Sequence, residues 1–214
     1  MMSASNRERR SLIDLTLRNQ QFMRVAPLCI GAVVNAVLAV FNGVVGFSQS
    51  SLWGQTMAGY FAILCFMGSY VAACSIKPER HSERTVMAVC GISIIVLAVS
   101  VAFVKYLIVG ESHKEALHPY VMILMAAFTF VTAAIAVVDA TKARKGDGYR
   151  QAFLRISVAS TLGAMMILEM QMLSTFAAPD DASAAFWIEV VSGVVFVLLL
   201  LLMGVSLILE SRRA

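Results

Sequence analysis

Long apolar runs alternate with short polar segments along the whole chain of 214 residues. A helix needs about 20 mostly apolar residues to cross the hydrocarbon core of a bilayer, and six windows of that length carry their charges at the edges. They cover residues 25–47, 52–75, 85–109, 117–138, 156–176 and 184–209. Backbone amides in lipid must bond within their own segment, and the short alternation typical of a membrane β-barrel does not occur. The pattern therefore predicts an all-α polytopic membrane helix bundle with six transmembrane helices.

A polar lead, residues 1–24, precedes the first apolar window. It combines arginines with large apolar residues, namely Arg7, Arg9, Arg10, Arg18 and Arg24 with Leu12, Ile13, Leu15, Leu17 and Phe22. Such a mixture suits a helix that lies on an anionic leaflet, and it suits a frayed basic tail equally well. We therefore divide the chain into a basic cytoplasmic lead, a transmembrane domain at residues 25–210 and a cytoplasmic tail at residues 211–214.

The distribution of charge predicts the orientation of the bundle. The composition is 59% hydrophobic and 14% charged, which is too apolar for an ordinary soluble domain. Nearly all of the 17 Lys and Arg residues lie in the lead, in the loops after the second and fourth windows, or at the C-terminus. Basic loops stay in the cytoplasm, so both termini are expected there, in the cytoplasmic membrane. The lipid bilayer then accounts for the net positive charge, and no nucleic-acid partner is needed.

Four small or polar residues fall on one face of the first window. Gly31, Asn35, Asn42 and Gly46 follow one another at intervals of four, seven and four. Such a face can let another helix approach closely and form hydrogen bonds to it. Alternatively, Asn35 and Asn42 line a pathway for a solute through the membrane.

An acid and an amide interrupt the fifth window, in the stretch MMILEMQML at residues 165–173. Gln171 shares a face with Ser160, whereas Glu169 points to the opposite side with Met165 and Met172. An intramembrane carboxyl group is costly unless it is protonated, hydrogen-bonded or facing water. We expect a neutral Glu169 bonded to a neighbouring helix, with no basic partner at its depth; coupling to a proton or cation is the alternative.

The remaining polar residues give weaker signals. Glu189 is expected at the outer headgroup level, exposed, with Trp187 as an interfacial anchor. The outer loop contains Glu111, His113, Glu115 and His118, but it lacks the spaced His pair of a zinc site, so neither a metal nor a cofactor is predicted. No nucleotide-binding, metalloprotease or nucleophile motif occurs in the sequence. The chain is therefore expected not to be an enzyme, and no catalytic residue is assigned.

Several segments resemble known membrane proteins. VVNAVLAVFNGVVGFSQSSLWGQTMAGYFAIL, residues 33–64, resembles the first helical hairpin of the cation diffusion facilitator family. ERHSERTVMAVCGISIIVLA and FWIEVVSGVVFVLLLLLMGVSLILES are similar to its third and last helices, so the resemblance covers roughly residues 26–211. It implies six helices with both termini cytoplasmic.

The resemblance does not extend to the metal ligands of that family. Its His and Asp pairs on the second and fifth helices have no counterpart here, because residues 53–75 contain no His, Asp or Glu and the fifth window has only Glu169. In overall character, RISVASTLGAMMILEMQMLSTF and SLWGQTMAGYFAIL resemble uncharacterised six-span proteins of Gram-positive bacteria.

Two functions fit these observations. The first is transport of a small ion or solute, with Asn35, Asn42 and Glu169 or Gln171 on the path; the sequence does not identify the ligand. The second is a non-transporting scaffold or regulatory partner in which the same residues hold helices together. In either case a homo-oligomer is expected, because the faces that carry Gly and Ser outnumber those that one small bundle needs to bury.

Overall fold

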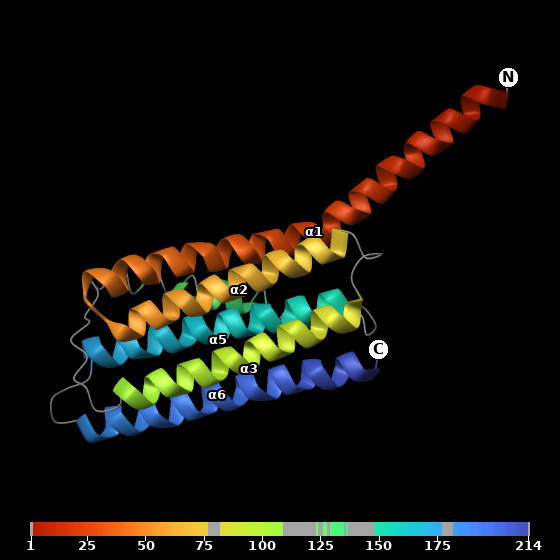
Figure 1. Cartoon of the computed structure of the whole chain (residues 1–214). Coiled ribbons are helices and arrows are strands. Elements are labelled where there is room, and N and C mark those ends of the chain that lie inside the picture. The colour runs from red at the N-terminus through yellow and green to blue at the C-terminus, as the bar shows by residue number, and fades with distance from the viewer. Residues whose placement is uncertain are drawn as a thin grey trace.

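All elements of the computed structural model are helices (Figure 1), and no strand occurs among the residues it describes. The helices are α1 (Met2–Ser48), α2 (Leu52–Ile76), α3 (Glu83–Ile108), α5 (Gly148–Phe176) and α6 (Ala182–Arg213). The residues described are 2–76, 82–108, 123, 126, 127, 129–134, 136, 148–176 and 182–213, and for residues 2–24 only the backbone is described.

All five helices are long and apolar enough to cross a membrane, and they confirm five of the six predicted windows. The bounds of α2 and α3 agree with the prediction to within two residues. Most of the fourth window, residues 117–138, lies outside the described residues, and those described within it, among them residues 129–134, are helical. Polar loops on which we based part of the charge count, such as residues 139–147, also lie outside them.

Three helices are longer than the apolar pattern predicted. α6 extends past its window, residues 184–209, at both ends, and α1 and α5 are extended at their N-terminal ends. α5 begins at Gly148 instead of near 156, because the backbone N–H of Gly148 donates to Glu83 Oε2 at 3.1 Å and the next turns bury Tyr149 and Phe153. α1 includes the polar lead as part of one helix of 47 residues with Pro27 inside it. In Figure 1 its N-terminal part runs on beyond the other helices. The lead is thus helical, and its position on a membrane surface stays a prediction.

A tight turn joins α1 to α2, which run antiparallel and pack together closely. Ser50 adopts a left-handed conformation with φ of 54°, and the N–H of Ser51 donates to the carbonyl of Gly46 at 2.8 Å. Ser51 then caps α2, since its Oγ accepts from the N–H of Gly54 at 3.0 Å. A Cβ at Gly46 would lie 2.6 Å from the backbone carbonyl carbon of Gly54. The absence of side chains at these two positions therefore sets the separation of the helices.

A second close pair is formed by α3 and α6. A Cβ at Gly91 or at Gly204 would lie 2.8 Å from the carbonyl oxygen of the other glycine, so these two backbones also touch. α5 lies between the two pairs and contacts α2, α3 and α6 (Figure 1). We call the end with the α1–α2 turn the hairpin end and the opposite end the C-terminal end. α3 and α5 both begin at the C-terminal end, where Gly148 meets Glu83, and run parallel.

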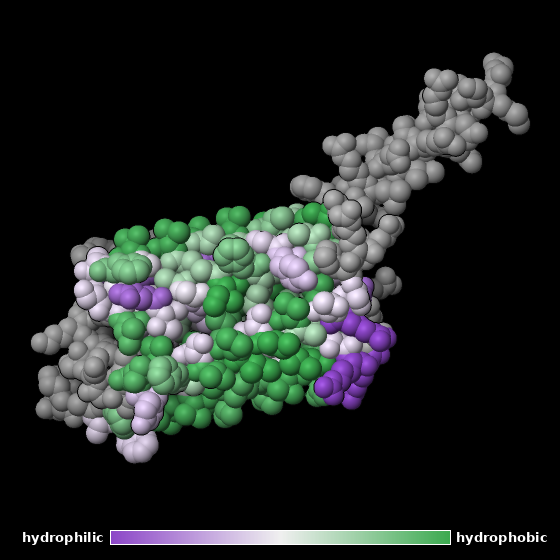
Figure 2. Space-filling view, in the orientation of Figure 1, coloured by the Kyte–Doolittle hydropathy of each residue, from purple (hydrophilic) through white to green (hydrophobic). Residues whose placement is uncertain are grey.

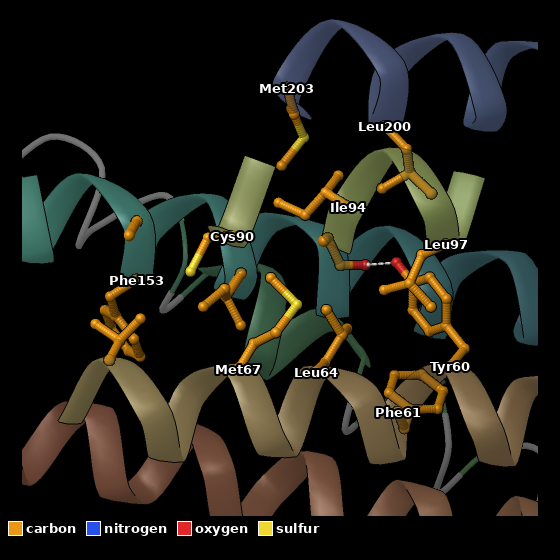
Figure 3. Close-up of a cluster of buried hydrophobic side chains, with 14 of the residues drawn as sticks. Tyr60, Phe61, Leu64, Met67, Cys90, Ile94, Leu97, Phe153, Leu200 and Met203 are labelled. Carbon is orange, nitrogen blue, oxygen red and sulfur yellow. Dashed lines mark hydrogen bonds between the residues drawn. The ribbon is translucent and has the colours of Figure 1, made fainter. Parts of the chain in front are cut away.

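Large apolar side chains from α2, α3, α5 and α6 fill the centre (Figure 3). Phe61, Leu64 and Ile94 are completely buried there. Tyr60 is 2% exposed, and its hydroxyl donates to the carbonyl of Ala159 at 2.7 Å. The outer surface is also apolar: the face shown in Figure 2 is mostly hydrophobic between the two ends, and strongly hydrophilic residues gather at the C-terminal end. Apolar residues inside and outside are what a helix bundle in lipid requires.

Candidate functional site

A buried lysine at the hairpin end forms the centre of the most polar cluster among the described helices. Lys105 of α3 forms an ion pair with Glu189 of α6, with 3.0 Å between Nζ and Oε1 and side chains that are 8% and 21% exposed. Its ammonium lies 3.4 Å from Met170 Sδ on α5 and 4.9 Å from the centre of the Trp53 ring on α2. Four helices thus converge on one positive charge.

The parallel course of α3 and α5 explains why these residues meet. Glu83 and Gly148, the first residues of the two helices, are hydrogen-bonded. Lys105 is 22 residues beyond Glu83, and Met170 is 22 residues beyond Gly148. Equal helical lengths, at about 1.5 Å per residue, bring the two side chains to the same depth. Because α6 runs antiparallel to α3, Glu189 reaches this depth from the start of its helix.

Glu169 lies beside this cluster on α5. It is close enough to Lys105 for an electrostatic interaction between the two side chains. Its Oε1 is buried and accepts no hydrogen bond from the described residues. Glu169 also borders a groove of about 260 Å³, whose exposed lining is almost wholly apolar, together with Thr129, Phe130, Met165, Leu168, Met172 and Leu173. The groove is open on one side, where Met165 and Met172 are 42% and 49% exposed.

These positions correct two expectations from the sequence. We expected no basic partner at the depth of Glu169, but Lys105 interacts with it, because its side chain turns inward from the end of α3 and α5 starts level with α3. The expected hydrogen bond from a neighbouring helix is not made to Oε1 of Glu169 by any of the described residues. The predicted face was right: Glu169 shares it with Met165 and Met172.

The side chains of Trp187 and Glu189 point to opposite sides of α6. Trp187 is 63% exposed and contacts Phe186, with ring centres 5.8 Å apart, as an interfacial anchor would be. Glu189 was expected to be exposed, but it points into the bundle to pair with Lys105. Two residues along a helix correspond to a rotation of about 200°, so the two side chains must point to opposite sides. This spacing was visible in the sequence and, with an antiparallel α3, indicates the ion pair.

The two asparagines of α1 lie apart from this cluster. Asn35 is 2% exposed, and its Oδ1 accepts a hydrogen bond from Ser160 Oγ of α5 at 2.6 Å. Asn42 is 5% exposed, and its Nδ2 donates to the carbonyl of Leu38 in its own helix at 2.8 Å. Gln171 is also buried, two residues from Glu169 and off the groove. The structure therefore does not assemble the four predicted pathway residues into one site.

Within the described ranges, no three His, Cys, Asp or Glu side chains come together in a way that could hold a metal ion. Glu111, His113, Glu115 and His118 lie outside those ranges. The cluster offers instead one ammonium and two carboxyl groups. If all three were ionised, Glu189 would balance Lys105, and Glu169 would give the cluster a net charge of one negative unit. One additional positive charge would then make the cluster neutral.

Comparisons with known proteins do not add to this description. No protein-family model matches the chain, and neither a curated protein nor a solved structure is significantly similar to it. The resemblance to cation diffusion facilitators therefore stays a prediction from the sequence.

Proposed function

We propose that this membrane protein spans the cytoplasmic membrane six times, with both termini in the cytoplasm, and carries a small cation through its helix bundle. The sixth span is supported by the direction of the helices. α3 ends at the hairpin end and α5 begins at the C-terminal end, so the chain between Ile108 and Gly148 has to return from one end to the other. The predicted window at residues 117–138 has the length for that crossing.

The positions of the basic side chains support the orientation. Arg84, Arg150, Arg155, Arg212 and Arg213 all belong to the C-terminal end of the bundle, at the starts of α3 and α5 and the end of α6. Among the residues whose side chains are described, the hairpin end has only Lys105, which is buried in an ion pair. Because basic residues accumulate on the cytoplasmic side, the C-terminal end faces the cytoplasm in this proposal.

The observation that carries the transport proposal is the environment of Glu169. Its Oε1 is buried and accepts no hydrogen bond from the described part of the chain, and a groove lies beside the residue. A carboxyl group in such surroundings is costly to insert into a membrane, so it is a candidate functional group. Binding a proton or another cation there neutralises the charge that Lys105 and Glu189 leave over. Release of that cation restores the net negative charge, which Lys105 partly offsets because it lies within electrostatic reach of Glu169.

The alternative function, a scaffold that transports nothing, is favoured by the asparagines. Asn35 and Asn42 are almost completely buried, and each forms a hydrogen bond within the protein. Such residues stabilise contacts between and within helices, each by about 0.6 to 2 kcal/mol. We therefore assign the two asparagines to packing and keep Glu169 as the candidate transport residue.

The two functions predict different access of water to these positions. In a variant without the four native cysteines, the single substitutions Asn35→Cys, Asn42→Cys and Glu169→Cys are tested with a charged, water-soluble thiol reagent in intact cells. The transport proposal predicts that the thiol introduced at position 169 reacts and that those at positions 35 and 42 do not. An unreactive thiol at position 169 in a correctly inserted protein would rule out the transport proposal and leave the scaffold.

Flux through the protein gives the second test. In proteoliposomes, proton, Na⁺ and K⁺ movements are compared between the native protein, Glu169→Gln and Glu210→Gln. Glu210 forms a more exposed ion pair with Arg155 at the C-terminal end, so it serves as the matched control. Loss of flux in Glu169→Gln alone supports the proposal, and equal flux in both variants contradicts it.

A further inference from the structure

The carboxyl group of Glu169 has few oxygen atoms around it. Its Oε1 is buried and accepts no hydrogen bond from any residue that the structure describes. Of the other residues that border the groove, only Thr129 carries an oxygen in its side chain. We infer that the cation that binds at Glu169 is a proton rather than a metal ion. This inference rests on the proposed function, because it names the cation of the same site.

Metal cations need more oxygen ligands than these residues supply. Ca²⁺ takes about six to eight, and Mg²⁺ demands about six in octahedral geometry. K⁺ is held by rings of backbone carbonyls that replace its hydration shell. In the part of the chain that the structure describes, no three His, Cys, Asp or Glu side chains are placed to hold a metal ion together. A metal ion at Glu169 would therefore lose its water without gaining enough ligands.

The backbone of α5 does not supply the missing oxygen atoms. In membrane transporters, Na⁺ is commonly coordinated by carbonyl groups of helices that are unwound near the middle of the bilayer. α5 is one uninterrupted helix from Gly148 to Phe176, and Glu169 lies within its regular turns. The carbonyl groups next to Glu169 therefore accept hydrogen bonds from their own helix.

A proton needs only one acceptor atom. It becomes part of the carboxyl group and leaves no separate ion to be coordinated, so a single glutamate is sufficient. Among the described residues, the charged groups nearest to Glu169 are Lys105 of α3, within electrostatic reach, and Glu189 of α6, which pairs with Lys105. α2 contributes the uncharged Trp53, and the residues of the fourth window at the groove are uncharged as well. When Glu169 releases its proton, Lys105 partly balances the carboxylate.

Modification of the purified protein by dicyclohexylcarbodiimide tests the inference. This apolar reagent adds to the protonated form of a carboxyl group and, after rearrangement, remains on it as an N-acylurea, whereas a carboxylate does not react. Mass spectrometry of peptides locates the modified residue. Glu169 should be modified in acidic buffer, and the modification should be lost in alkaline buffer. Addition of Na⁺, K⁺ or Mg²⁺ at constant pH, with choline as the control salt, should leave it unchanged.

Two variants serve as controls for the assignment of the modified residue. Glu169→Gln should lose the modification of that peptide. Glu210→Gln should keep it, because Glu210 belongs to the more exposed pair with Arg155 at the C-terminal end. Size-exclusion chromatography shows whether both variants are folded.

The outcomes separate this inference from the transport proposal. Modification of Glu169 together with loss of proton flux supports both. Protection of Glu169 by a metal cation at constant pH, or a Na⁺ or K⁺ flux that needs Glu169, would overturn the inference while the transport proposal stands. Absence of modification in either buffer would also overturn the inference. Modification that metal cations do not affect, without flux of any cation, would support the inference and contradict transport.

Discussion

Replacement of Lys105 by methionine removes the positive charge but keeps a flexible side chain of similar length. Two unit charges 3.0 Å apart, as in the pair with Glu189, attract each other by about 5 kcal/mol at an effective dielectric constant of about 20. Most of this attraction offsets the desolvation of the two groups, so it is not the net contribution of the pair. The variant loses stability mainly because the Glu189 carboxylate remains buried without its partner. The free energy of unfolding of Lys105→Met should therefore be about 3 to 5 kcal/mol below that of the native protein.

Titration with SDS in mixed micelles, followed by circular dichroism, measures these differences. The double variant Lys105→Met, Glu189→Gln should recover more than half of the loss, since no unpaired carboxylate remains at position 189. Arg155→Met is the control: its partner Glu210 is 3.4 Å away and both side chains are about a third or more exposed, so its loss should be at most about 1 kcal/mol. If Lys105→Met is as stable as Arg155→Met, the reasoning is wrong.

Two further changes test the packing of the bundle by the same titration. Gly46→Ala should lower the free energy of unfolding by about 1 to 3 kcal/mol, because its Cβ would lie 2.5 Å from a backbone nitrogen of α2, whereas Gly59→Ala, with nothing within 4 Å, should not. Tyr60→Phe should lower it by about 0.5 to 1.5 kcal/mol through loss of the bond to Ala159. Tyr106→Phe, at a side chain that is 80% exposed, should have no effect, and an equal loss there would contradict the role of that bond.

Hydropathy located the five helices that the structure describes. The window at residues 52–75 agrees with α2, Leu52–Ile76, because the thickness of the hydrocarbon core fixes the length of an apolar helix. The start of α5 was not predictable in this way, since it depends on the Glu83 carboxylate, which belongs to another helix. Periodicity also gave the correct face for Glu169, opposite to Gln171.

The charged cluster could not be derived from the apolar pattern, because hydropathy does not say which helices are neighbours. Lys105 and Glu189 are 84 residues apart in the chain, and each is close to the end of an apolar window. From its position in the sequence alone, each residue would be expected at the membrane interface, with its charged group among the lipid headgroups. Only the antiparallel contact of α3 and α6, through Gly91 and Gly204, turns the two side chains toward each other.

The pair between α3 and α6 also orders events during synthesis. The ribosome makes Lys105 well before Glu189, so the newly inserted third helix brings a lysine to the membrane before its counter-charge exists. Until α6 is present, the carboxylate that balances this lysine is missing. Assembly of the Lys105 site is thereby tied to α6, and a chain that stops before α6 keeps an ammonium without its counter-charge.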